Sequence, residues 1–138
     1  MIRDILVDAG PLIALLDRAS RDHERCVDTL KQISGKLLTT WMPVTEAMYL
    51  LGPIRGGQEG LLDMIEREAV NVLSIEHDDI APIRRLMHKY LDLPMDFADA
   101  SLVHVAARER ILDIFTLDRR DFGAYRINSR QSFNIFPR

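Results

Sequence analysis

The sequence of 138 residues contains a single cysteine, Cys26, so it cannot form an intrachain disulfide. We expect this side chain to serve as a small hydrophobe on a helix face. No apolar stretch approaches the roughly 18 residues that a membrane-spanning helix needs. Acidic residues also stand among the first eight positions, where a signal peptide would be apolar. The sequence therefore predicts a soluble, cytoplasmic protein without a membrane partner.

An excess of basic residues is missing as well. The chain has 18 Lys and Arg against 21 Asp and Glu, a net charge of −3, which is unlike a protein that binds duplex DNA. The arginines are unevenly placed, because five of them lie between residues 119 and 138 beside one acid, Asp121. That end is either a solvated face or a contact for nucleic acid. The length and the hydrophobic content of 47% fit one globular domain over residues 1–138.

Short apolar runs alternate with segments of helical periodicity along the chain. The runs predict strands at residues 5–7, 37–40, 70–75, 111–116 and 134–136. Helices are expected at residues 11–16, 26–33, 43–51, 61–65, 80–90 and 96–110, with Pro11 and Pro43 in opening turns. Such alternation is typical of a parallel sheet covered by helices on both faces.

Four acids occupy equivalent places in this alternation. Asp8 and Asp118 follow strands, and Glu46 and Asp99 lie in the opening turns of helices. Because parallel sheets bind ligands at the carboxyl ends of their strands, the four side chains are candidates for one site. Carboxylates that share a site must take up protons or bind a cation. Ligands that are all oxygen suit Mg²⁺ or Mn²⁺, and such an ion suits phosphodiester hydrolysis.

Each of these acids also has a purely structural interpretation. Asp8 is placed to be a turn residue or a helix N-cap. Glu46 and Asp99 lie in first turns, where a negative charge interacts favourably with the helix dipole, and Asp118 lies in a predicted turn. The absence of a cysteine pair and of His-x-x-x-His argues against zinc.

Several further residues are weaker candidates for contacting the substrate or the ligands. Asp96 is expected to cap the helix that contains Asp99, and Asp121 is either a turn acid or part of the site. Thr116 is either a strand former or a donor to the metal water or the phosphate. Arg119 and Arg120 follow Asp118 directly, so we expect them where phosphates arrive. No histidine is expected in the site.

The motifs resemble those of the PIN-domain family. Residues 7–16, Val-Asp-Ala-Gly-Pro-Leu-Ile-Ala-Leu-Leu, are similar to the family's opening motif, and Thr45-Glu46 resembles the helix with the second acid. Residues 96–103 are similar to the third motif, and residues 115–122 to the fourth, threonine-x-aspartate followed by Asp-Phe. One position departs from the family, because Ala9 stands where Thr or Ser is common.

This resemblance implies a three-layer α/β/α fold with a parallel sheet of four or five strands. It implies a Mg²⁺- or Mn²⁺-dependent endoribonuclease that cleaves single-stranded RNA, with Asp8, Glu46, Asp99 and Asp118 holding the metal. Small proteins of this kind are commonly VapC-type toxins that dimerise and bind a cognate antitoxin protein. Two alternatives remain: a non-catalytic PIN-like module that binds protein or RNA, and a phosphatase, which the lack of Asp-x-Asp at Asp8 disfavours.

Overall fold

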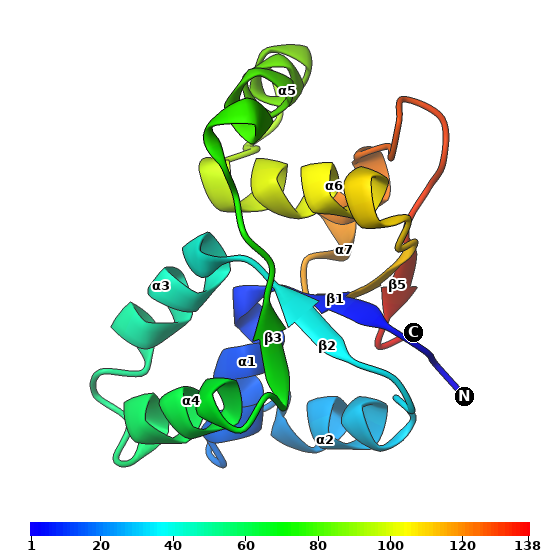
Figure 1. Ribbon diagram of the computed structural model, residues 1–138. Coiled ribbons are helices and arrows are strands. Elements are labelled where there is room, and N and C mark those ends of the chain that lie inside the picture. The colour runs from blue at the N-terminus through cyan, green and yellow to red at the C-terminus, as the bar shows by residue number, and fades with distance from the viewer.

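A five-stranded parallel sheet lies between two layers of helices in the computed structural model, which describes residues 1–138 (Figure 1). The strand order is β3-β2-β1-β4-β5, and every neighbouring pair is parallel. The strands are β1 (Ile5–Val7), β2 (Leu37–Thr39), β3 (Val70–Val72), β4 (Asp113–Phe115) and β5 (Asn134–Phe136). The predicted α/β architecture and its fifth strand are confirmed.

Seven helices connect and cover the strands. They are α1 (Ala9–Leu16), α2 (His23–Lys31), α3 (Trp41–Leu50), α4 (Gly57–Glu66), α5 (His77–Lys89), α6 (Phe97–Glu109) and α7 (Arg119–Ala124). None of them combines the length and apolarity that crossing a membrane requires.

Two hydrophobic cores form because successive strand residues point to opposite faces of the sheet. Ile5 and Val7 join the core under α1 to α4, whereas Leu6 between them joins the core under α5 to α7. Figure 1 shows the same division, with α1, α2 and α4 on one side of the strands and α5, α6 and α7 on the other. Cys26 is fully buried in the first core, as its expected role as a small hydrophobe requires.

Some element boundaries differ from those expected. Helices α1 and α3 begin two residues before Pro11 and Pro43, so each proline is the third helical residue. A proline is tolerated there because the first N–H groups of a helix have no intrahelical acceptor. Strands β3 and β4 are shorter than their apolar runs, because Ile75 and Ile111 pack against the second core outside the strands.

Helix α7 was not predicted. It spans six residues, Arg119–Ala124, in a segment that the sequence suggested was a turn and a basic tail. Its signal is local: the Asp118 side chain accepts a hydrogen bond from the N–H of Asp121 (3.0 Å), which is an N-cap bond. Phe122 is fully buried and anchors this short helix to the second core.

Candidate active site

The sheet topology brings the predicted acids to one edge. Strand β1 is central, and the chain proceeds from it to β2 and β3 on one side and later to β4 and β5 on the other. Asp8 follows β1 directly, and Asp118 lies three residues beyond the end of β4, its neighbour. Parallel sheets form crevices at the carboxyl ends of strands where the strand order reverses in this way.

Asp8 is held from two directions. Its Oδ1 accepts a hydrogen bond from the N–H of Ala9 (2.8 Å), and its Oδ2 accepts one from the hydroxyl of Thr116 (3.0 Å). Thr116 is fully buried, and its Oγ1 also accepts the N–H of Asp118 (3.0 Å), so one threonine links the two acids. The pKa of Asp8 is raised from 3.8 to about 6, mainly by burial and also by the charges of Glu46 and Asp118, while the hydrogen bonds from Ala9 and Thr116 oppose the rise. The N-cap interpretation of Asp8 is thus correct as geometry, and it coexists with a place among other carboxylates.

Asp99 lies in the first turn of α6 and faces the same region. Its pKa is raised from 3.8 to about 7, mainly by burial and then by the charges of Asp96 and Asp8. The Tyr125 hydroxyl donates to Asp99 Oδ2 (3.0 Å) and partly opposes the rise. The Asp96 side chain accepts the N–H of Asp99 (2.8 Å), as expected of the residue that caps α6.

Glu46 and Asp121 complete the group of acids. Partial burial and the charge of Asp96 raise the pKa of Glu46, whose residue is largely exposed on α3. Burial, a hydrogen bond with Asp118 and the charges of Asp118 and Asp96 raise the pKa of Asp121, and Arg120 alone lowers it. All six acids of the sequence prediction therefore lie in one region, near enough for their charges to influence one another's pKa.

No three of the His, Cys, Asp and Glu side chains are close enough in this arrangement to hold one metal ion. The acids are nevertheless coupled through space, and no lysine or histidine is among the causes of their pKa shifts. An ion bound by several of them requires side-chain rotation, which is open to Glu46 because it is largely exposed.

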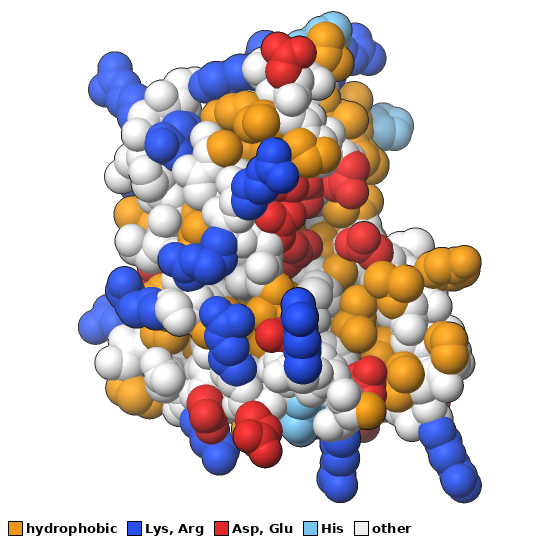
Figure 2. All heavy atoms as spheres, turned by 180° about the vertical axis from the view of Figure 1, so that it is seen from behind, with side chains coloured by type: hydrophobic (Ala, Val, Ile, Leu, Met, Phe, Trp, Pro, Cys, Tyr) orange, Lys and Arg blue, Asp and Glu red, His pale blue; other side chains and the backbone are white.

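The two arginines after Asp118 have different surroundings. The Arg119 guanidinium donates to the carbonyl of Pro137 (2.7 Å) and thereby ties α7 to the end of β5. Arg120 is exposed, and its positive charge lowers the pKa of Asp121. Figure 2 shows a face on which acidic side chains gather near the middle, with Lys and Arg on one side and hydrophobic side chains on the other.

Tyr125 is the residue of this site that the sequence did not predict. It is fully buried, and its ring packs edge-to-face with Tyr90 and Phe122, each with ring centroids 5.2 Å apart. Tyr125 lies 26 residues after Asp99, so only the folded chain shows that its hydroxyl reaches that carboxylate. Thr40 and Ser101 form a second buried contact that was missed, a hydroxyl pair 2.7 Å apart that ties the start of α3 to α6.

His104 belongs to a different cluster of side chains, between α5 and α6. Its Nε2 contacts Asp79 Oδ1 (2.6 Å) on α5, and the Arg108 guanidinium donates to Asp79 Oδ2 (3.2 Å). The pKa of Asp79 is lowered to about 2. The backbone hydrogen bond from Glu76 is the largest cause, and the contacts with His104 and Arg108 add to it. The cluster joins α5 to α6 and is separate from the six acids.

Comparison with known proteins identifies the family. A family model described as the PIN domain matches residues 5–128. The chain belongs to the PIN domain family. The resemblance seen in the motifs is therefore confirmed, and the match includes every acid of the site.

Named relatives of this PIN domain come from two bacteria. Ribonuclease VapC26 of Mycobacterium tuberculosis is 29% identical over 136 residues, which cover 96% of this chain and all of that protein. The structure is similar to that of M. tuberculosis VapC20, a toxin described as cleaving the sarcin-ricin loop. The TM-score is 0.77 at 16% identity, and the match covers 84% of this chain and 91% of the VapC20 chain. A chain of a toxin-antitoxin complex from Klebsiella pneumoniae gives a TM-score of 0.62 at 20% identity. That match covers 87% of this chain and 91% of the Klebsiella chain. These two similarities bear on the fold.

Proposed function

We propose that this PIN domain is a metal-dependent endoribonuclease that cleaves single-stranded RNA. One observation supports it above all: burial raises the pKa of Asp8 to about 6, and burial with the charges of Asp96 and Asp8 raises that of Asp99 to about 7, at the edge where a parallel sheet binds ligands. A cluster of acids with so little compensating positive charge is stabilised by a bound cation. The relative that spans nearly the whole chain is named a ribonuclease, which agrees with this chemistry.

The donor atoms fit Mg²⁺ or Mn²⁺. The proposed ligands, Asp8, Glu46, Asp99 and Asp118, offer only carboxylate oxygen, which these hard ions prefer. The only cysteine, Cys26, is on α2 and is buried in the first core. When bound, such an ion lowers the pKa of a coordinated water and stabilises negative charge on phosphate oxygens.

The neighbouring residues position these ligands. Thr116 fixes Asp8 Oδ2 and the backbone of Asp118, and Tyr125 fixes Asp99 Oδ2. Asp96 uses its carboxylate to cap α6, so we assign it an electrostatic and structural part rather than a ligand's. Asp121 adds negative charge beside Asp118. Arg120 has no ion pair and is free to contact an incoming phosphate, whereas Arg119 contributes a fixed positive charge at the end of β5.

We further propose that the chain is the toxin of a toxin–antitoxin module, with a cognate antitoxin and a second copy of itself as protein partners. Helix α3 exposes large apolar side chains: Trp41 at 55%, Leu50 at 48% and Tyr49 at 81%. Large apolar side chains that a helix exposes in this way favour a protein contact. Tyr49→Arg should weaken self-association measured by light scattering, or antitoxin binding, without changing RNA cleavage by the monomer.

The test of the nuclease is cleavage of an unstructured, end-labelled RNA. We expect cleavage with Mg²⁺ or Mn²⁺, none with EDTA, and a loss of at least about 100-fold in Asp99→Asn or Asp118→Asn. Asp28→Asn is the matched control, because Asp28 is exposed on α2 in the other helical layer. Cleavage that persists in EDTA or in both site variants would contradict the proposal. An intact fold with no cleavage under any metal would instead support a non-catalytic binding module.

The toxin role has its own test. Expression of the chain alone should arrest growth, and Asp99→Asn should relieve the arrest if RNA cleavage causes it. Unimpaired growth at matched levels of wild-type protein contradicts the toxin role and leaves the nuclease assay unaffected.

A further inference from the structure

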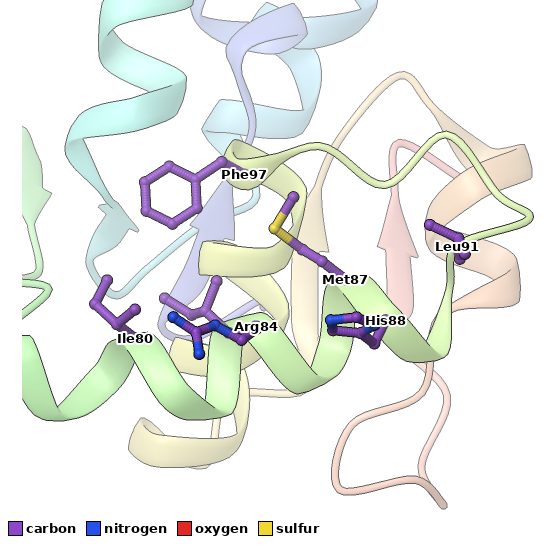
Figure 3. Close-up of a pocket in the computed structure, with 7 residues that line it drawn as sticks. Ile80, Arg84, Met87, His88, Leu91 and Phe97 are labelled. Carbon is purple, nitrogen blue, oxygen red and sulfur yellow. The ribbon is translucent and has the colours of Figure 1, made fainter.

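A groove of about 370 Å³ lies between α5 and the start of α6 (Figure 3). Five of its seven lining residues are hydrophobic, and the other two, Arg84 and His88, are basic. This volume lies at the lower end of the range for small-molecule sites, which are mostly apolar with a few polar groups. The groove is therefore suited to a small, flat, apolar group attached to negative charge.

Phe97 connects this groove to the carboxylates. It is the first residue of α6, directly after Asp96 and two residues before Asp99. Its side chain is 41% exposed, and it makes no ring–ring contact of the kind that Phe122 and Tyr125 make. In Figure 3 the ring lies over the face of α5 that carries Ile80, Arg84 and Met87. A half-exposed aromatic ring thus belongs to the same first turn of α6 as the proposed ligand Asp99.

Arg84 supplies unpaired positive charge at the same place. Its guanidinium forms no ion pair, whereas Arg108 on the neighbouring helix is held by Asp79 and Glu109. Apolar side chains that line the groove are also partly uncovered, with Ile80 38% and Leu91 78% exposed. The groove therefore combines an aromatic surface, an apolar floor and a free cation.

We propose that this groove binds one unstacked base of the RNA strand, next to the phosphodiester that lies at the carboxylates. The inference rests on the proposed nuclease function and adds a substrate subsite to it. Proteins hold single-stranded RNA by stacking splayed bases on aromatic side chains. The base stacks on Phe97, and Arg84 neutralises a phosphate that the six acids would otherwise repel. Both polar lining residues are basic, which complements a phosphate chain.

Abasic oligonucleotides test the stacking directly. In an Asp99→Asn background with Mg²⁺, the affinity of an unstructured RNA is measured against a series in which one residue at a time lacks its base. Phe97→Ala and Phe97→Leu should weaken binding of the intact strand by roughly 5- to 100-fold. When the missing base is the one that stacks on Phe97, the Phe97 variants and the Asp99→Asn parent should bind that strand with equal affinity. Leu62→Ala, 48% exposed on α4 in the other layer, should leave every affinity unchanged.

A charge variant tests the second contact. Arg84→Gln should lower the salt slope of RNA binding by about 1, as the loss of one phosphate contact does. Arg85→Gln is the matched control, because Arg85 is the next residue of α5 and does not line this groove. Equal slopes in the two variants would overturn the role of Arg84.

Three results overturn the base-binding groove. In the first, the Phe97 variants bind the intact strand as tightly as the parent does. In the second, they bind every abasic strand more weakly than the parent does, and by the same factor. In the third, Phe97→Ala converts a wild-type dimer to a monomer in light scattering. The third result would mean that a second copy of the chain covers the groove. Failure of the proposed nuclease function gives a different result. A wild-type protein that never cleaves RNA, yet shows the Phe97-dependent abasic pattern, contradicts the proposed reaction and still supports base binding in the groove.

Discussion

Replacing Asp8 with asparagine should stabilise the protein in EDTA at neutral pH. The folded structure raises the pKa of Asp8 from 3.8 to about 6, mainly through burial. A difference of about two pKa units corresponds to roughly 3 kcal/mol that the charge costs the folded state. Asparagine keeps the acceptor for Ala9 N–H but disturbs the bond from Thr116, at a cost of about 1 kcal/mol. The expected net gain is roughly 1–2 kcal/mol.

The pH dependence of this gain identifies its cause. Between pH 3.8 and about 6 the folded state binds more protons at Asp8 than the unfolded state does, so its contribution lowers stability as the pH rises. The cost is complete above about pH 6 and absent below 3.8, where Asp8 is neutral in both states. Urea denaturation of wild type and Asp8→Asn at several pH values, with EDTA, measures the difference.

Two results would refute this reasoning. One is an Asp8→Asn variant that is less stable than wild type at pH 7.5, which would give Asp8 a structural role that outweighs its charge. The other is a gain that stays the same at pH 4, which would assign the effect to packing. Asp28→Asn, at an exposed position of α2, controls for a general change in net charge.

Two further variants separate positioning from stability. Tyr125→Phe removes the donor to Asp99 and so raises the pKa of that carboxyl further; the acidic limb of the pH–rate profile should move to higher pH, and an unchanged profile contradicts the positioning role. Asp79→Asn should cost roughly 1–3 kcal/mol at pH 7 by weakening the contacts to His104 and Arg108. Because the pKa of Asp79 is lowered to about 2, this cost should fade as the pH drops from 3.8 toward 2; unchanged cleavage by Asp79→Asn shows that the two clusters are separate.

The sequence predicted the strands well because their signal is local. Ile5–Val7 is an apolar run and Asn134–Phe136 is largely apolar, and both are strands with the predicted limits. The runs at 70–75 and 111–116 overestimated their strands, because hydrophobicity reports burial and not ladder hydrogen bonds. Ile75 and Ile111 are partly buried against the second core without being strand residues.

The acids of the site were predictable because each has a fixed place in the βα alternation. Asp8 and Asp118 follow strands, and Asp99 follows an N-cap, which local patterns indicate. Tyr125 was not predictable, because its hydroxyl meets Asp99 only through the packing of α7 and the following residue on α6. Arg119 shows the same limit, since its acceptor at Pro137 lies 18 residues away.

The most direct measurement for the proposed metal site is anomalous scattering from crystals soaked in Mn²⁺. We expect a strong peak within bonding distance of carboxylate oxygens of Asp8, Asp99 and Asp118, with Glu46 turned toward it. The peak should weaken or vanish in Asp99→Asn crystals that keep the same fold. A protein that cleaves RNA in Mn²⁺ while its crystals show no manganese at these carboxylates, or show it bound elsewhere, would contradict the assignment of this site.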